Sequence, residues 1–353
     1  MTSLNSELVI DSRILINNIN YIKKNHSKKS KFLAVIKSDA YGHHLENVAR
    51  DINKYVDGFG VVRLDEAIAI RKVSNKKILL MQGVYTKEEF YISRKNNFDL
   101  VVHNNEQLKI IKENNDYKNL WLKINTGMNR LGFEVDDFLN VYDELLHDKD
   151  FTLMTHLASS NDANNPSNSK QFEIFDDVLS KLNNEIPKSV ANTGCIFNFP
   201  ERTYDWVRCG IGIYGGYIND EFLKTAMTLR SPIVNIKKIK KGESVGYDGR
   251  ATAESDMKIA SLYIGYADGL PVSIKDGTNL LVNGQIAKIF GKISMDITTV
   301  DISNISNCKI GDWCEFFSPQ FPISNIAKSN GLISYYFMTG IKSRVKKIYK
   351  RVN

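Results

Sequence analysis

Two stretches of the sequence place basic side chains directly after short apolar runs. Lys37 follows the apolar residues 32–36, and Lys123 follows residues 120–122, with Arg130 seven positions further along the chain. A lysine that ends an otherwise apolar strand is partly desolvated, which lowers its pKa and makes its amine nucleophilic. Two cations on either side of a glycine turn can clamp an anion. Each feature by itself is also compatible with a lysine that extends along the strand end toward solvent.

A glycine-rich stretch follows another apolar run near residue 207. Residues 207–216 read Val-Arg-Cys-Gly-Ile-Gly-Ile-Tyr-Gly-Gly and contain the pattern G-x-G-x-x-G. A dinucleotide-binding fold would need a long helix after this pattern and an acidic residue about 20 positions on, and the sequence has neither. In a barrel, glycine-rich backbone after the last two strands is a common phosphate site. A nucleophilic lysine facing a phosphate site indicates a phosphorylated aldehyde held as a Schiff base, which is pyridoxal 5'-phosphate (PLP).

The elements that would position these residues are short apolar runs that alternate with longer helical patterns. This alternation predicts parallel strands with crossover helices, and eight such units favour a closed (β/α)8 TIM-like barrel over an open doubly wound sheet. Functional side chains of such a barrel lie at the carboxyl ends of its strands, where Lys37, Lys123 and His156 fall. The expected strands are residues 32–36, 59–62, 78–81, 100–102, 120–124, 151–155, 189–191 and 206–207, and the clearest helices are 64–73, 105–113, 136–146 and 169–182.

The pattern changes after about residue 226. Short runs of β-branched residues then alternate with turn signals such as Asp248-Gly249 and Asn283-Gly284, which predicts a mostly antiparallel β domain. We therefore expect an α/β barrel domain over residues 1–226 and a C-terminal β domain over residues 227–353, with residues 1–10 able to pair with the β domain. The expected strands of the second domain are residues 233–239, 258–264, 280–282, 287–289, 298–301 and 313–317.

Composition restricts the classes of protein further. A hydrophobic fraction of 42% and a charged fraction of 25% are typical of a globular chain, and the net charge of +7 is modest for 353 residues. No apolar run approaches the roughly 18 residues of a membrane span, and no export signal is visible at the N-terminus. Four cysteines without a C-x-x-C pair fit the reducing cytoplasm. No cluster with metal-ligand spacing occurs, so we expect no metal. Six basic residues between positions 342 and 351 favour a solvated tail over a nucleic-acid site.

Five segments, in order along the chain, closely resemble motifs of the alanine racemase family, whose members are PLP enzymes of fold-type III. The last two lie in the expected β domain, which single-domain PLP-binding relatives of the barrel and barrel-type PLP decarboxylases are not expected to carry. An amino-acid decarboxylase and a non-catalytic PLP carrier remain the more distant alternatives. The five segments are residues 34–43 (Ala-Val-Ile-Lys-Ser-Asp-Ala-Tyr-Gly-His), 123–132 (Lys-Ile-Asn-Thr-Gly-Met-Asn-Arg-Leu-Gly), 207–215, 264–269 (Ile-Gly-Tyr-Ala-Asp-Gly) and 291–296 (Gly-Lys-Ile-Ser-Met-Asp).

The resemblance implies an isomerase that interconverts L- and D-alanine and supplies D-alanine for peptidoglycan. Lys37 would bind PLP through its amine and act as acid and base on one face of the substrate Cα. Tyr266 of the partner subunit would act on the other face, so the enzyme would be a cytoplasmic homodimer with shared active sites. Two bases are needed because a proton must leave one face and return on the other.

The resemblance also assigns roles around the cofactor and the substrate. Arg208 would lie against the pyridine nitrogen, and His156 would bridge Arg208 and Tyr266. Lys123 matches a position that is carbamylated in many family members. The remaining expected site residues are Tyr41, Asn192, Thr193, Gly210 and Ile211 around the phosphate, and Arg130, Met295 and Asp296 around the substrate.

One position departs from the family pattern in a way that bears on the substrate. Ser343 stands where most alanine racemases carry a tyrosine that touches the phosphate and walls the substrate pocket. A serine at this position lacks the ring and would enlarge the pocket. A broad-specificity racemase that also accepts serine or larger side chains is therefore the alternative to a strict alanine racemase.

Overall fold

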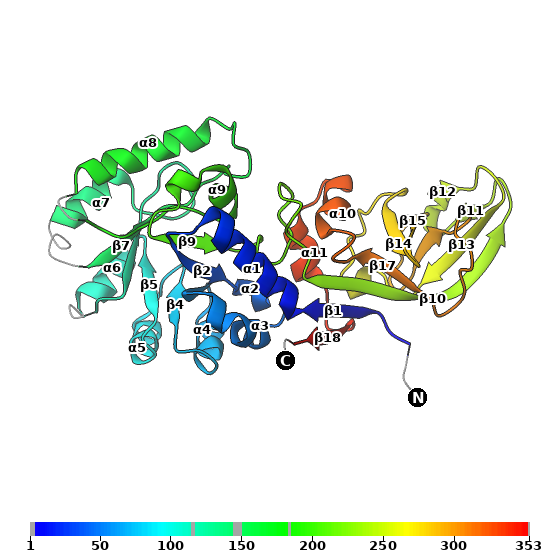
Figure 1. Cartoon of the computed structure of the whole chain (residues 1–353), viewed down its shortest axis with the longest axis horizontal. Coiled ribbons are helices and arrows are strands. Elements are labelled where there is room, and N and C mark those ends of the chain that lie inside the picture. Colours follow the sequence, from blue (N-terminus) through cyan, green and yellow to red (C-terminus); the bar gives the residue numbers. More distant parts are fainter. Residues whose placement is uncertain (1–3, 114–116, 144–149, 183–184, 352–353) are drawn as a thin grey trace. The chain divides into compact units, whose positions relative to one another are not determined.

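The computed structural model describes residues 4–113, 117–143, 150–182 and 185–351 (Figure 1). The chain divides into two compact units. The barrel unit comprises Ile19–Ala40 and His44–Ile213, and the β unit comprises Met1–Asn18, Tyr41–His43 and Tyr214–Asn353.

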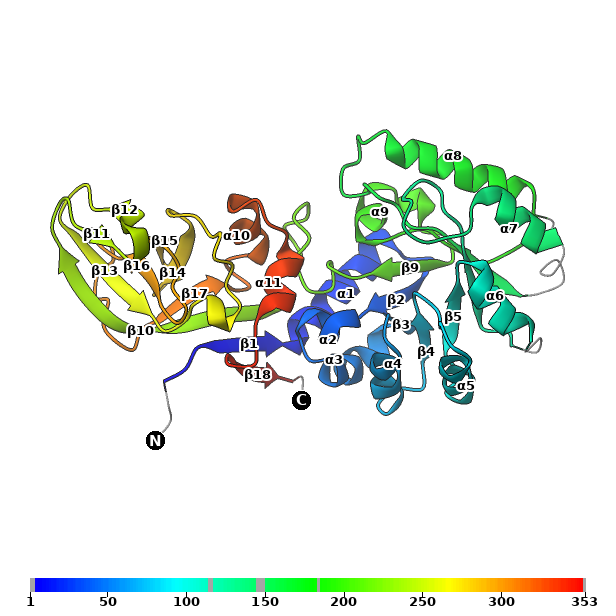
Figure 2. The same ribbon diagram turned by 180° about the vertical axis from the view of Figure 1, so that it is seen from behind.

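The barrel unit is built on eight parallel strands in the order β8-β7-β6-β5-β4-β3-β2-β9, with helices outside them (Figures 1 and 2). β8 has only two residues, and beyond it the Arg208 N–H donates to the Ala191 carbonyl at 2.9 Å, which joins the two ends of the sheet. The prediction of a (β/α)8 barrel is thereby confirmed as an eight-stranded near-barrel. The strands are β2 (Lys31–Val35), β3 (Gly58–Val61), β4 (Lys77–Leu80), β5 (Asp99–Val102), β6 (Leu120–Lys123), β7 (Phe151–Met154), β8 (Lys188–Ser189) and β9 (Trp206–Cys209).

The helices of the barrel unit include the four that the apolar periodicity predicts, here α4, α6, α7 and α8. The final residues of the expected helix 136–146, from residue 144 on, lie outside the described residues. α1 (Ser12–His26) precedes the first barrel strand along the chain. The others are α3 (Leu45–Ile52), α4 (Leu64–Arg71), α5 (Lys87–Lys95), α6 (Asn105–Lys112), α7 (Val135–Val141), α8 (Ser167–Ser180) and α9 (Thr193–Asn198).

Large apolar side chains fill the interior of the barrel. The rings of Trp121 in β6 and Trp206 in β9 lie 5.6 Å apart, although these strands are not neighbours in the sheet, so the contact crosses the interior. Leu33, Val101 and Met154 pack in the same cluster. Because side chains alternate between the two faces of a strand, the residues two positions further along point to the same interior.

The second unit is a mostly antiparallel sheet in which six strands close into a ring, β10-β13-β16-β15-β14-β17, with β17 pairing back to β10. The prediction of a mostly antiparallel β domain after the barrel is confirmed. β1 lies beside β10 and pairs in parallel with β18. The strands are β1 (Glu7–Asp11), β10 (Met227–Ile239), β13 (Met257–Leu262), β14 (Asn279–Val282), β15 (Gln285–Ile289), β16 (Thr298–Asp301), β17 (Trp313–Phe317) and β18 (Lys346–Lys350), with β11 (Ser244–Val245) and β12 (Ala251–Thr252) forming a small separate sheet.

Two short helices of the β unit, α10 (Ile323–Ser329) and α11 (Ser334–Gly340), are absent from the sequence-based expectations. Both are seven residues long, and α11 reads Ser-Tyr-Tyr-Phe-Met-Thr-Gly. Aromatic residues, serine, threonine and glycine have weak helix propensity, and a helix of two turns depends on tertiary packing. Burial of Phe337 and Met338 provides that packing.

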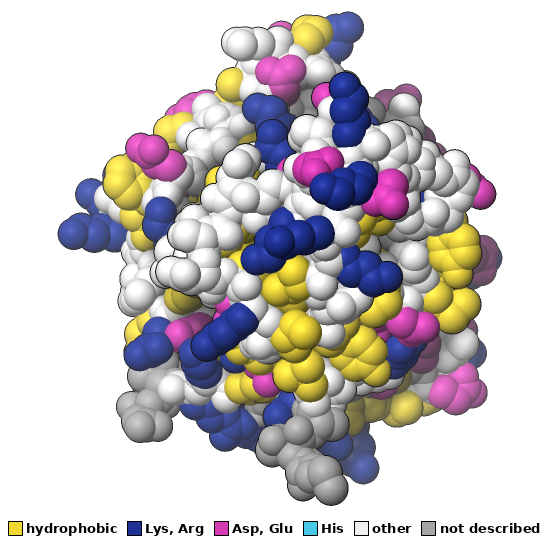
Figure 3. All heavy atoms as spheres, turned by 90° about the vertical axis from the view of Figure 1, so that its right-hand side faces the viewer, with side chains coloured by type: hydrophobic (Ala, Val, Ile, Leu, Met, Phe, Trp, Pro, Cys, Tyr) yellow, Lys and Arg dark blue, Asp and Glu magenta, His cyan; other side chains and the backbone are white. Residues whose placement is uncertain are grey.

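On the face drawn in Figure 3, lysine and arginine side chains are spread among apolar and acidic ones. All four cysteines are free and buried. None of the helices in the described ranges is long and apolar enough to cross a membrane.

Candidate active site

A polar layer lies directly above the apolar layer of the barrel interior. Two positions beyond the interior residues of β5, β6, β7 and β9 come His103, Lys123, His156 and Arg208, so these side chains also point inward. His103, Lys123 and Arg208 are 5%, 6% and 3% exposed, and His156 is half-buried. The carboxyl end of the barrel therefore holds ionisable side chains that the apolar layer shields from below.

Lys37 lies two positions beyond the end of β2 and is half-buried at this same end of the barrel. Burial lowers the pKa of its amine, the nearby Arg130 lowers it further, and Glu66 opposes both effects. The three residues that follow, Ser38, Asp39 and Ala40, have φ values of 55°, 54° and 53°. The left-handed conformation costs about 1–2 kcal/mol for each non-glycine residue, so other interactions must hold this turn.

Glu66, in the first turn of α4, holds the left-handed turn. Its Oε1 accepts hydrogen bonds from the backbone N–H groups of Ser38 at 2.6 Å and Asp39 at 3.4 Å. Its Oε2 accepts from the N–H groups of Val62 and Arg63, both at 3.3 Å. Sequence reasoning missed Glu66, because an acidic residue in the first turn of a helix is common and needs no other explanation.

Arg208 is fixed by acceptors on three sides. Its Nη1 donates to the carbonyl and the hydroxyl of Ser189, each at 2.7 Å, and its Nη2 donates to the Thr155 carbonyl at 2.7 Å and to His156 Nδ1 at 3.2 Å. Burial lowers the pKa of Arg208 to about 10, which still leaves the guanidinium charged at neutral pH. Burial and then Arg208 hold the pKa of His156 well below its ordinary value. Since His156 Nδ1 accepts a hydrogen bond, its proton is on Nε2.

Lys123 is surrounded by other cations. Burial, followed by Arg208, Arg130 and Lys37, lowers the pKa of its amine to about 8. Arg130 is exposed at the end of the loop that follows β6. Four positive groups thus influence one another at one end of the barrel, and this charge fits an anionic ligand.

Four of the expected phosphate residues meet where the chain leaves β8 and β9. The Gly210 N–H donates to Thr193 Oγ1 at 3.2 Å, and Thr193 and Ile211 are buried. Asn192 caps α9, because its Oδ1 accepts from the Cys195 N–H at 3.1 Å. The structure therefore assigns Asn192 a local structural task besides any contact with a ligand.

Tyr41 belongs to the β unit, apart from the other expected phosphate residues. Its ring stacks on Tyr214 with centroids 4.6 Å apart. Gly42 follows with φ +79°, and a Cβ on it would lie 2.2 Å from the Met338 carbonyl oxygen. Only glycine permits this close approach, which holds Tyr41 in place.

Tyr266 begins a short 3-10 turn (Tyr266–Asp268) in the β unit and is 36% exposed. Its backbone N–H donates to the Ser294 carbonyl at 3.0 Å. A Cβ on Gly265 would lie 2.3 Å from the carbonyl oxygens of Ser294 and Met295. The segment that carries Tyr266 is therefore packed backbone to backbone against the segment that carries Met295 and Asp296.

Arg344 links the two segments of the β unit through their carboxylates. Its Nη2 donates to Asp296 at 2.6 Å, and its Nε lies 3.5 Å from Asp268 Oδ1. Asp268 Oδ2 in turn accepts from the Gly265 N–H at 2.9 Å. Ser343, the residue that departs from the family pattern, is exposed beside Arg344. Asp268 and Arg344 are further positioning residues that sequence reasoning did not assign.

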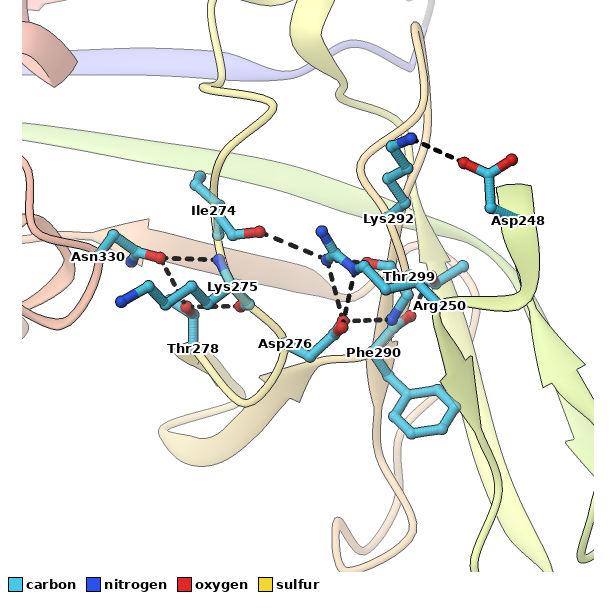
Figure 4. Close-up of polar contacts among 11 residues, drawn as sticks. Asp248, Arg250, Ile274, Lys275, Asp276, Thr278, Phe290, Lys292, Thr299 and Asn330 are labelled. Carbon is cyan, nitrogen blue, oxygen red and sulfur yellow. Dashed lines mark hydrogen bonds and ion pairs between the residues drawn. The ribbon is translucent and has the colours of Figure 1, made fainter.

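A polar network anchors the start of the segment 291–296 (Figure 4). Asp276 Oδ1 accepts from the Gly291 N–H at 2.7 Å and pairs with Arg250, whose Nη2 donates to the Gly291 carbonyl at 2.9 Å. Lys292 pairs with Asp248 at 2.8 Å. Gly291, at the start of the segment that carries Met295 and Asp296, is thus held by both its N–H and its carbonyl.

The expected site residues fall into two groups according to unit. The barrel unit brings together Lys37, Lys123, Arg130, His156, Asn192, Thr193, Arg208, Gly210 and Ile211, and the β unit carries Tyr41, Tyr266, Met295, Asp296 and Ser343. Within the described ranges no group of three or more His, Cys, Asp or Glu could hold a metal ion.

A barrel with Lys37 and Lys123 among cations at its mouth, followed by a closed β unit with an exposed tyrosine, fits the class of PLP-dependent racemases. The chain matches the family "Alanine racemase, N-terminal domain" over residues 10–218 and "Alanine racemase, C-terminal domain" over residues 226–349. It belongs to the alanine racemase family.

Individual relatives match over nearly the full length. The alanine racemase of Nitrosomonas eutropha is 34% identical over 353 aligned residues, which cover 96% of this chain and 97% of the relative. The crystal structure of the biosynthetic alanine racemase of Pseudomonas aeruginosa superposes with a TM-score of 0.92 at 29% identity, covering 98% of this chain and 99% of that one. The alanine racemase of Bartonella henselae, solved with covalently bound pyridoxal phosphate, has a TM-score of 0.88 at 26% identity, covering 98% and 100%.

Replacing Glu66 by glutamine tests whether this carboxylate holds the turn after Lys37. Four backbone N–H groups donate to the two carboxylate oxygens of Glu66, whereas the side chain of glutamine has only one acceptor oxygen. We therefore expect the free energy of unfolding to fall by about 1–3 kcal/mol. We also expect the pKa of Lys37 to fall further, because Glu66 raises it. Chemical denaturation measures the first effect. Asp65→Asn, an exposed change of the same charge at the same helix end, is the control; equal destabilisation by both variants would contradict the assignment.

Proposed function

We propose that this protein is a cytoplasmic, homodimeric alanine racemase that uses PLP to interconvert L- and D-alanine and so supplies D-alanine for peptidoglycan. The observation that carries the proposal is the half-buried, pKa-lowered amine of Lys37 among Lys123, Arg130 and Arg208, in a chain that belongs to this family. The B. henselae relative, which holds pyridoxal phosphate covalently, supports the choice of cofactor.

The barrel residues fit the chemistry of PLP. The phosphate and ring oxygen of PLP are negative, and the mouth of the barrel holds four mutually repelling cations. Lys37 would hold the aldehyde carbon, and Arg208 would face the pyridine nitrogen. When bound, PLP supplies an electron sink that makes the proton on the substrate Cα removable. The phosphate would be held by Tyr41, Asn192, Thr193, Gly210 and Ile211.

The guanidinium of Arg208 would determine whether the pyridine nitrogen of the cofactor carries a proton. A guanidinium donates hydrogen bonds and accepts none, and Ser189, Thr155 and His156 already fix its orientation. A ring nitrogen facing Arg208 would therefore stay unprotonated, and the cofactor would be a weaker electron sink. This restraint suits a reaction that only removes and returns one proton.

Two side chains would move that proton. Lys37 would act on one face of the substrate Cα, since its lowered pKa leaves more of the amine neutral and able to accept a proton. Tyr266 of the partner subunit would act on the opposite face, and the Nε2–H of the neutral His156 would stabilise its tyrosinate. Arg130 would bind the substrate carboxylate, with Met295 and Asp296 at the entrance.

The range of amino acids that the enzyme accepts distinguishes two candidate functions. Ser343 is exposed and has no ring to wall a pocket, which favours a broad-specificity racemase as the second candidate. For strict alanine specificity we expect alanine to be racemised at least about tenfold faster than serine, a difference of about 1.4 kcal/mol.

The test measures L-to-D rates with purified protein over a panel of alanine, serine and larger amino acids. Ser343→Tyr is the matched variant, and we expect it to narrow the range of substrates by restoring the ring. A preference for alanine below tenfold would favour the broad-specificity candidate. Absence of racemisation for every amino acid would reject the proposed function.

Separate variants of Lys37 and Tyr266 test the two-base assignment. Lys37→Ala should abolish the Schiff-base absorbance at about 420 nm. Tyr266→Phe should keep this absorbance but slow racemisation by about 10²–10⁴-fold, equally in both directions, because L- and D-alanine have the same free energy and each direction needs both bases. Measurement in both directions checks this; full activity of Tyr266→Phe in both directions would reject the assignment.

We also propose that Lys123 is carbamylated, because an anion there would relieve the repulsion from Arg130 and Arg208. The reaction needs the neutral amine, so at constant dissolved CO2 we expect occupancy to rise as the pH increases through about 8, the pKa of this group. Carbon-13 NMR with labelled CO2 measures the occupancy, and Lys123→Ala identifies the signal. An unmodified Lys123 at high pH and high CO2 would contradict this proposal.

A further inference from the structure

His103 is a buried histidine that the proposed reaction does not use. It follows β5, and the pairing of Val102 with Leu122 places it beside Lys123, which ends β6. Val101 and Trp121, two positions earlier on each strand, both belong to the interior apolar cluster. His103 and Lys123 therefore point into the same part of the barrel interior, and they are 5% and 6% exposed.

The hydrogen bonds of Asn104 determine which ring nitrogen of His103 carries the proton. Asn104 Oδ1 accepts from the Gln107 N–H at 2.9 Å as the cap of α6, so its amide nitrogen is the atom that lies 3.4 Å from His103 Nδ1. An amide nitrogen only donates, hence Nδ1 accepts and the proton is on Nε2. Burial and then Lys123 lower the pKa of His103, against smaller opposing effects of the Gln82 carbonyl and its own carbonyl, so the ring is neutral.

The Nε2 atom of His103 is buried and has no hydrogen-bond partner among the residues that the structure describes. Buried donors are almost always satisfied in folded proteins, so this N–H requires an acceptor. The neighbouring Lys123 cannot supply one as an ammonium, which has no lone pair. A carbamate on Lys123, which lies beside His103 on the neighbouring strand, would supply two acceptor oxygens.

We propose that His103 is a positioning residue whose Nε2–H donates a hydrogen bond to the carbamate of Lys123. This inference rests on the carbamylation proposed above. In the modification, the neutral amine attacks the carbon of CO2 and an N–C bond forms. One C=O bond opens to an oxyanion, and the displaced N–H proton passes to solvent. Carbamylation thus replaces a cation that repels Arg130 and Arg208 by an anion. This anion can accept hydrogen bonds from His103 and from both arginines.

Two substitutions of His103 separate the hydrogen bond from general packing. The side-chain amide nitrogen of glutamine reaches about as far as the Nε2 of histidine, whereas that of asparagine reaches only about as far as Nδ1. We expect His103→Asn to raise the CO2 concentration at half occupancy about tenfold, the effect of one lost hydrogen bond. His103→Gln should restore occupancy close to that of the unchanged protein.

The experiment uses the PLP-loaded protein and carbon-13 CO2 at constant pH, with the carbamate signal assigned by its loss in Lys123→Ala. The absorbance near about 420 nm and the alanine assay are measured on the same samples. Equal half-occupancy concentrations in the unchanged protein and His103→Asn, or equal losses in both His103 variants, would overturn the role of His103. Absence of any carbamate signal would overturn both it and the carbamylation, while racemisation in that sample would leave the proposed function intact.

Discussion

The alternation of side chains along the barrel strands is the constraint on which the site depends. A layer of large apolar side chains, with Trp121 and Trp206 in contact across the interior, closes the barrel from below. The next inward positions on the same strands are Lys123 and Arg208. Because the layer beneath them excludes water, these cations are desolvated, and burial is the largest cause of the lowered pKa of each. The same backbone geometry thus provides both the core and the reactivity of the site.

Positive charge gathers at the barrel mouth around Lys37 and Lys123. Among the described residues, three other cations lower the pKa of Lys123, while Glu66 raises the pKa of Lys37. An anionic cofactor, a substrate carboxylate and a carbamate would each lower this repulsion. The charge imbalance that folding creates would therefore favour both binding of an anion and the proposed modification.

Both proposed bases are held by their backbone surroundings. The left-handed turn after Lys37 is bonded to Glu66, and the turn at Tyr266 is packed against Ser294 and Met295 because residue 265 is glycine. In each case the reactive side chain leaves a segment whose conformation other parts of the same unit determine. A substitution at these supports would change the geometry of a base without touching it.

The sequence by itself determined the alternation of strands and helices in the barrel unit, the lysines at the ends of β2 and β6, and the family, because apolar periodicity and short motifs are local in the chain. It did not reveal Glu66, His103, Arg344 or α11. Glu66 resembles an ordinary helix-start acid, His103 becomes notable only when its Nε2 is seen to be buried without a partner, and α11 depends on burial of Phe337. Tertiary structure decided these features, because hydrogen bonding, desolvation and charge act through distances between residues far apart in sequence.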